Sequence, residues 1–97
     1  SSLNQSMVSH LKKKSIKLKK LSNLKINETI IDIGSNDGTF LGFFPLKNKL
    51  IGVDPTIKKL SKFYRKDIIQ IASFFSEKKG MLKNLLFFFF LLFWIIF

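Results

Sequence analysis

The sequence IIDIGSNDGTFL at residues 30–41 decides the fold, together with LIGVDP at residues 50–55. The first stretch begins as an apolar, β-branched run with one acid, which is typical of a buried parallel strand. A loop of small polar residues and glycine follows. The short helix after it has to end near Phe44, because Pro45 disfavours helical geometry in the residue before it. The second stretch is another apolar strand, followed by Asp54. This order predicts an α/β fold whose loops, at the carboxyl ends of parallel strands, hold a nucleoside-like ligand.

The loop residues have the conformational freedom that such a turn requires. Gly34 lets the chain turn sharply and approach a ligand without a Cβ in between. Asn36 tolerates a positive φ better than most residues. We expect Gly38 to open the short helix and to allow close packing over the ligand. Asp54 lies 22 residues after Asp32, close to the ~20 residues that separate a glycine loop from the acid that binds a ribose hydroxyl.

The charges of the loop indicate a cationic ligand. Asp32 and Asp37 belong to this region, and no lysine or arginine occurs between residues 26 and 46. Phosphate-binding loops, in contrast, offer backbone N–H groups and cations. Two carboxylates suit the ammonium and sulfonium groups of S-adenosylmethionine (SAM), which we therefore expect as the cofactor.

Other loop motifs fail on the same residues. A P-loop needs a lysine after its last glycine, but Gly38 is followed directly by Thr39, and the dinucleotide motif G-x-G-x-x-G lacks its second and third glycines. A calcium-binding EF-hand loop would place Ile33 and Phe44 at ligand positions, and neither binds calcium. The alternative is that SNDG is only a turn from strand to helix, since its residues are common in turns. That alternative leaves the spacing of Asp54 unexplained.

These residues carry a resemblance to a known family. DIGSNDGTFL at residues 32–41 and GVDPT at residues 52–56 resemble the SAM-binding half of class I methyltransferases. The chain is most similar to C-methyltransferases that act on nucleotide-linked deoxysugars, over about residues 2–76, including SLNQSMVSHL at residues 2–11. Ser73 stands where an aspartate is expected in that family. The resemblance implies that Asp54 holds the ribose of SAM and that the methionine end is lined by Asp32, Gly34, Asn36, Asp37 and Gly38.

The resemblance also implies a reaction, namely methyl transfer from SAM to a deprotonated carbon of a nucleotide-linked sugar. His10 is a candidate for the base, because histidine titrates near neutral pH. The alternative is that His10 is a surface or packing residue, as a lone histidine on a helix more often is. A complete methyltransferase sheet needs about 150 residues or more. We therefore expect these 97 residues to be a fragment that is inactive by itself. Alternatives are a SAM methyltransferase with another acceptor and a non-enzymatic, membrane-anchored basic protein.

Residues 1–27 are predicted to form a basic amphipathic helix over one side of the sheet. Its apolar residues recur at helical spacing, at Met7, Leu11, Leu18 and Leu21. Lysines crowd this helix and contribute to the net charge of +11. Nucleic acid is not expected as a partner, because no aromatic residue stands among these lysines to stack on bases. The same charge would attract an anionic nucleotide-sugar substrate.

Residues 28–76 are predicted to form a partial Rossmann-like core that binds SAM. We expect strands at residues 29–33, 50–53 and 68–72 and a helix at residues 56–64. Cysteine is absent, so neither a disulfide nor a thiolate metal site is expected, and no other metal site is predicted.

Residues 77–97 are an apolar tail, without a single polar residue from Leu85 to Phe97. As a helix those 13 residues span ~20 Å at about 1.5 Å each, less than the ~30 Å of a bilayer core. The tail has three interpretations: a short membrane segment, a buried strand, or the product of a truncation or shifted reading frame in an AT-rich gene. We favour the last, because Phe and Leu runs are common in such frames. The expected location is cytoplasmic, or membrane-associated if the tail is an anchor.

Overall fold

Helix α1 (Gln5–Ser22) is capped by an asparagine at each end, Asn4 before its first residue and Asn23 after its last. In the computed structural model, which describes residues 2–74, the Asn4 side chain accepts a hydrogen bond from the Met7 N–H at 2.8 Å. Such an N-cap satisfies one of the free N–H groups of the first turn. Asn23 ends the helix in the left-handed conformation, with φ 50°. The helix predicted in residues 1–27 is confirmed.

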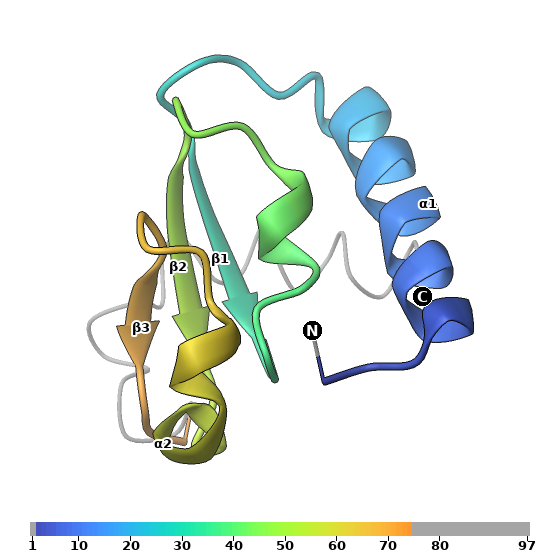
Figure 1. The fold of residues 1–97 in the computed structure, drawn as a ribbon. Coiled ribbons are helices and arrows are strands. Elements are labelled where there is room, and N and C mark those ends of the chain that lie inside the picture. The colour runs from blue at the N-terminus through green and yellow to red at the C-terminus, as the bar shows by residue number, and fades with distance from the viewer. Residues whose placement is uncertain (1, 75–97) are drawn as a thin grey trace.

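Three strands form one parallel sheet in the order β1-β2-β3 (Figure 1). They are β1 (Thr29–Ile33), β2 (Lys49–Val53) and β3 (Ile69–Ile71). In the register, Ile31 is opposite Ile51, and Ile51 is opposite Ile69. The predicted strands agree with these bounds to within one residue. The described residues thus form a small α/β domain with three parallel strands and two α-helices.

The connections between the strands are short helical turns. A 3-10 turn, η1 (Leu41–Phe43), follows the first loop, and Phe44 is extended as Pro45 requires. The helix expected at residues 56–64 is shorter and divided into α2 (Ile57–Leu60) and the 3-10 turn η2 (Ser61–Phe63). Tyr64 then leaves the helical conformation, with ψ 136°.

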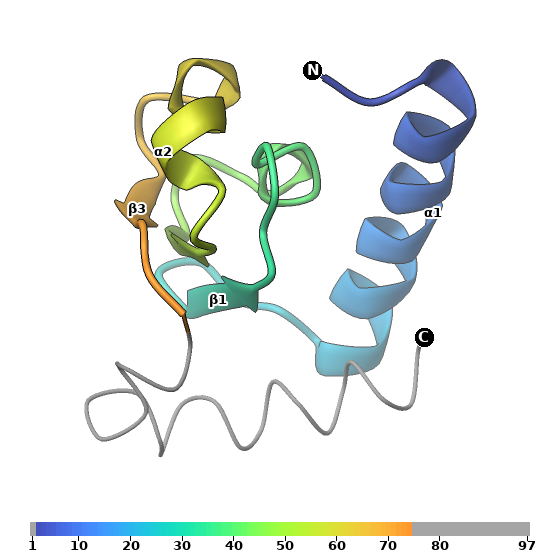
Figure 2. The ribbon, with the colours of Figure 1, turned by 90° about the horizontal axis from the view of Figure 1, so that it is seen from below.

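All of these helical elements lie on one face of the sheet (Figures 1 and 2). Side chains from these helical elements and from the connections next to them form the main core with inward residues of β1 and β2. The core residues are Leu18, Ile30, Phe40, Leu41, Phe44, Leu50, Ile57, Tyr64 and Ile68. Of the residues expected on the apolar side of α1, Leu18 is buried and Leu11 packs against this core, whereas Met7 and Leu21 are exposed.

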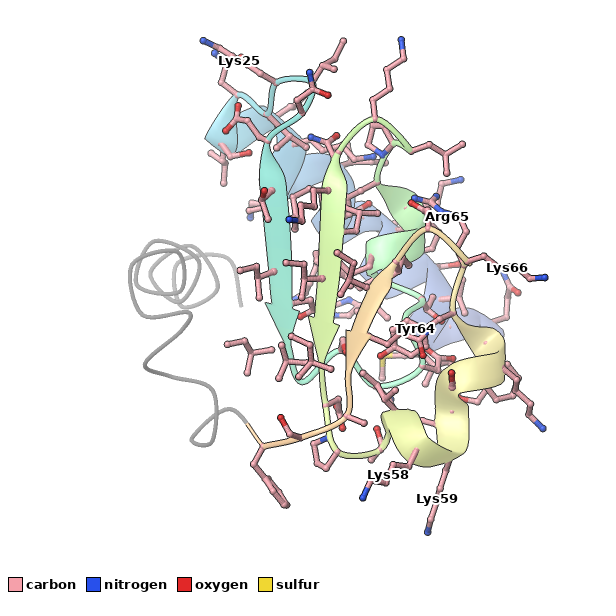
Figure 3. All side chains as sticks on the ribbon, turned by 90° about the vertical axis from the view of Figure 1, so that its left-hand side faces the viewer. Lys25, Lys58, Lys59, Tyr64, Arg65 and Lys66 are labelled. Atoms are coloured by element: carbon pink, nitrogen blue, oxygen red, sulfur yellow. The ribbon has the colours of Figure 1, made fainter. Side chains whose placement is uncertain are left out.

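Arg65 ties the end of η1 to the connection before β3 (Figure 3). Its guanidinium group donates to the carbonyl oxygens of Gly42 at 3.0 Å and Phe44 at 2.8 Å, and it pairs with Asp67. Gly42 lies within this 3-10 turn and Phe44 directly follows it, at a helix end where free carbonyl groups need donors. The predicted tail at residues 77–97 lies outside the described residues. None of the helices in residues 2–74 has the length and apolar composition needed to cross a bilayer.

Candidate cofactor site

The loop between β1 and η1 turns at the carboxyl edge of the sheet. Gly34, Asn36 and Gly38 have φ values of +80°, 52° and +79°, so every second residue adopts the left-handed region. Glycine reaches this region without strain, and asparagine does so more readily than most residues. The positive φ expected at Asn36 is confirmed. The loop is thereby curled over the end of β1.

A cavity of about 210 Å³ lies between this loop and α1. One wall is apolar and comes from the start of the chain, and the other is polar and comes from β1 and the loop. The lining residues are Leu3, Met7, Leu11, Asp32, Gly34, Ser35, Asn36, Asp37 and Phe40. The volume is below the ~300 Å³ of ordinary small-molecule pockets, so the cavity suits one end of a cofactor.

Asp32 is the buried acid of this cavity. Its residue is 6% exposed, and no hydrogen bond to its carboxyl group occurs within residues 2–74. Desolvation by burial, and secondarily the negative charge of Asp54, raises the pKa of Asp32 to about 7. A buried carboxylate without a partner is costly, so the site favours either a proton on Asp32 or a cation beside it.

Asp37 has a different environment, although it lines the same cavity. It is 1% exposed. One carboxylate oxygen accepts from the Ser2 N–H at 2.8 Å and the Ser2 hydroxyl at 3.0 Å. The other accepts from the Thr39 N–H at 3.0 Å and the Thr39 hydroxyl at 2.6 Å. Asp37 therefore joins the segment before α1 to the loop, and it holds the apolar wall of the cavity in place.

Asp54 links the loops that follow β1 and β2. Its Oδ2 accepts from the Asn36 N–H at 2.9 Å, and its Oδ1 accepts from the Thr56 N–H at 2.8 Å and the Thr56 hydroxyl at 2.6 Å. Partial desolvation alone would raise the pKa of Asp54, but these hydrogen bonds outweigh it and lower the pKa. Asp54 is thus an ionised carboxylate beside the loop. It is not among the residues that line the cavity.

Tyr64 supports the loop through hydrogen bonds, a role that the sequence pattern did not indicate. Its hydroxyl donates to the Asn36 carbonyl oxygen at 2.6 Å and lies 2.6 Å from the Ser35 Oγ, which donates in turn. Burial raises the pKa of Tyr64 to about 12, against the opposing effect of the Ser35 hydrogen bond. The sequence pattern placed Tyr64 on the apolar face of the predicted helix. That pattern could not show which residues Tyr64 contacts.

The close packing at Gly38 involves the Tyr64 ring, and the place of Gly38 among the cofactor-binding residues stays a prediction. A Cβ on Gly38 would lie 2.6 Å from the Tyr64 ring, and Gly38 is not among the cavity-lining residues. A Cβ on Gly52 would similarly lie 2.7 Å from the Ser35 Oγ. Both glycines thus make room for the Tyr64–Ser35 support of the loop.

His10 is exposed on α1 and is not among the residues that line the cavity, unlike Met7 and Leu11 of the same helix. Its role as a base stays a prediction. Ser73, which follows β3, has a buried hydroxyl oxygen with no hydrogen-bond partner among residues 2–74.

No protein-family model, no curated protein and no solved structure matches the chain. The functional argument therefore depends on the geometry of the loop, the cavity and the acids around them.

Proposed function

We propose that residues 2–74 are the SAM-binding portion of a Rossmann-like class I methyltransferase. The observation that carries this proposal is the state of Asp32, which lines the cavity, is almost fully buried and has no hydrogen-bond partner in the described part of the chain. An ammonium group in the cavity would stabilise the ionised carboxylate and remove the cost of burying it alone.

The rest of the cavity fits the methionine end of SAM. Leu3, Met7 and Leu11 offer an apolar wall to the methylene groups, while Gly34 leaves the backbone open at the turn, with nothing within 4 Å of a Cβ built there. Asp54 lies outside this cavity but beside the loop. Its ionised carboxylate retains lone pairs that can accept hydrogen bonds from ribose hydroxyls.

When bound, SAM supplies an electrophilic methyl group. The residues of this chain bind and orient that cofactor: Asp32 pairs with the ammonium group, Asp54 accepts from the ribose, and Asp37 holds the wall. The proposed acceptor of the parent enzyme is a carbon of a nucleotide-linked sugar. This part of the proposal is supported by the resemblance of DIGSNDGTFL and GVDPT to that family.

Calorimetric titration of the full chain with SAM tests the proposal. Asp54→Ala is expected to cost about 2–4 kcal/mol of binding free energy, the range for losing a charged hydrogen-bond partner. Asp54→Asn keeps a side-chain oxygen that can accept from Thr56 but removes the negative charge. Comparison with Asp54→Ala therefore separates the effect of the charge from the effect of the loop structure. Asp32→Asn should weaken SAM more than it weakens an analogue without the ammonium group.

Asp67→Asn is the matched control, because Asp67 pairs with Arg65 and does not line the cavity. This variant should bind SAM as the wild type does. Absence of SAM binding by the wild-type chain, or equal binding by all the variants, would remove the proposed function.

A further inference from the structure

Helix α1 has a row of lysines on the side that faces away from the sheet. Ser15 and Leu18 are the buried residues of this helix, so its outer side lies opposite them. Lys13, Lys17 and Lys20 are exposed and follow one another at intervals of four and three residues, which is the spacing of neighbours on one helix face. At about 1.5 Å per residue the row is ~10 Å long. Figure 2 shows that α1 forms one side of the molecule, with no other described element beyond it.

No negative charge of the described residues balances this row. Residues 1–27 contain seven lysines and neither aspartate nor glutamate. Lys13, Lys17 and Lys20 form no ion pair within residues 2–74. Like charges at this spacing destabilise a helix, and burial, with a smaller contribution from the charge of Lys17, lowers the pKa of Lys14 beside the row. An anionic partner at this face would therefore stabilise it.

Lys19 of the same helix has a role within the fold, in contrast to the row. Its Nζ donates to the Phe43 carbonyl oxygen at 2.6 Å and lies 5.1 Å from the centre of the Phe44 ring. Lys19 thus ties α1 to η1. The ammonium groups of the row make no such contact within residues 2–74, so they stay available to a partner.

Two aliphatic side chains flank the row. Ile16 is 49% exposed and Leu21 is 56% exposed. Ile16 follows Lys13 by three positions and Leu21 follows Lys17 by four, so each lies beside the row. Exposed aliphatic side chains among lysines are typical of helices that lie on a membrane surface. A nucleic-acid site would instead use aromatic or arginine side chains to stack on bases, and α1 contains no arginine, phenylalanine, tyrosine or tryptophan.

We propose that the outer face of α1 docks the chain on an anionic phospholipid membrane. Lys13, Lys17 and Lys20 attract the headgroups, and Ile16 and Leu21 enter the headgroup region. The helix lies along the membrane surface, because its other side packs against the core of the domain. The proposal goes beyond the proposed function and is independent of it, since none of these five residues lines the cavity.

Co-sedimentation of the full chain with lipid vesicles tests the proposal. The vesicles contain either phosphatidylcholine alone or equal parts of phosphatidylcholine and phosphatidylserine. The first variant carries Lys13→Gln, Lys17→Gln and Lys20→Gln. Glutamine has a helix propensity similar to that of lysine, so this variant should keep α1, which circular dichroism checks.

The matched control carries Lys58→Gln, Lys59→Gln and Lys66→Gln. These lysines are exposed and project outward from α2 and from the connection before β3, as Figure 3 shows. The control therefore loses the same charge from another part of the surface. A third variant, with Ile16→Gln and Leu21→Gln, keeps all the lysines and removes only the aliphatic side chains.

The wild-type chain should bind the vesicles with phosphatidylserine and not those of phosphatidylcholine alone. Each lysine near an anionic surface contributes about fivefold in affinity, so loss of the row should weaken binding about a hundredfold, and the control should weaken it by less than about tenfold. Raising the salt concentration from about 0.1 M to about 1 M shortens the Debye length from ~10 Å to ~3 Å and should release the chain. The aliphatic variant should also bind more weakly than the wild type.

Equal losses in the two lysine variants, or equal binding to both kinds of vesicle, would overturn the proposal in favour of adsorption through another part of the chain. The same vesicle affinity in the aliphatic variant and the wild type would exclude contact with the headgroup region. Tighter binding of a uridine oligonucleotide than of the phosphatidylserine vesicles, lost with the row, would overturn the proposal in favour of a nucleic acid.

Discussion

Replacement of Asp32 by asparagine is expected to remove a pH dependence from the stability of the chain. Burial, with a smaller contribution from the charge of Asp54, raises the pKa of Asp32 from its ordinary value of 3.8 to about 7. In the unfolded chain the carboxyl group titrates near its ordinary value. Between these two pKa values, the folded state holds a proton that the unfolded state has lost, so the free energy of unfolding falls as the pH rises through this window.

The size of the effect follows from the two pKa values. They differ by about three units, which corresponds to about 4 kcal/mol at about 1.36 kcal/mol per unit. Part of this window lies below pH 5. By the linkage relation, the free energy of unfolding falls by about 2–3 kcal/mol between about pH 5 and about pH 8. Asparagine has no proton to lose. The Asp32→Asn variant should therefore gain about 2–3 kcal/mol more over the wild type at pH 8 than at pH 5.

Urea denaturation followed by circular dichroism measures these free energies in the full chain. Neither Asp54, whose pKa is lowered, nor Tyr64, whose pKa is raised to about 12, titrates in this window. Asp67→Asn is the control. The hydrogen bond from Arg65 lowers the pKa of Asp67, so this variant should keep the pH dependence of the wild type. If the free energy of unfolding of Asp32→Asn falls between pH 5 and pH 8 by the same amount as that of the wild type, the reasoning is refuted.

Two further predictions concern the support of the loop. Gly38→Ala should lower the free energy of unfolding by about 1–3 kcal/mol, because the backbone has φ +79° and the new Cβ would lie 2.6 Å from the Tyr64 ring. Gly42→Ala is the control, because nothing lies within 4 Å of a Cβ built there and φ is not positive. It should change the free energy of unfolding by less than about 1 kcal/mol in the same thermal or urea unfolding experiment. Equal effects of the two substitutions would contradict the packing argument. Tyr64→Phe should cost about 1–3 kcal/mol, because the Ser35 hydroxyl and the Asn36 carbonyl oxygen lose a buried partner, and faster amide hydrogen exchange in the loop than in the wild type should accompany it.

The local features of this protein could be predicted from the sequence because they depend on neighbouring residues. The β-branched run at β1, the stop at Pro45 and the positive φ of Asn36 follow from the preferences of single residues and their neighbours. The place of Asp54 after β2 followed from spacing alone. Helix α1 could be predicted for the same reason, since apolar periodicity is a property of one segment.

The contacts that shape the candidate site join residues far apart in the chain. Ser2 and Asp37 are separated by 35 positions, and Asn36 and Tyr64 by 28. No local pattern contains such pairs. The sequence therefore indicated acids at the loop. It could not show that Ser2 and Thr39 donate hydrogen bonds to Asp37, while Asp32 has no hydrogen-bond partner within residues 2–74.

The sequence by itself determined the strands, the loop conformation and the acids at the carboxyl edge, because backbone preference and hydrophobic pattern act over a few residues. The tertiary structure alone decided that Gly38 makes room for Tyr64, that Asp32 is buried deeply enough to hold a proton near neutral pH, and that one face of the sheet has no helix within the described residues. Those properties arise from burial and contact between distant segments, which exist only once the chain has folded.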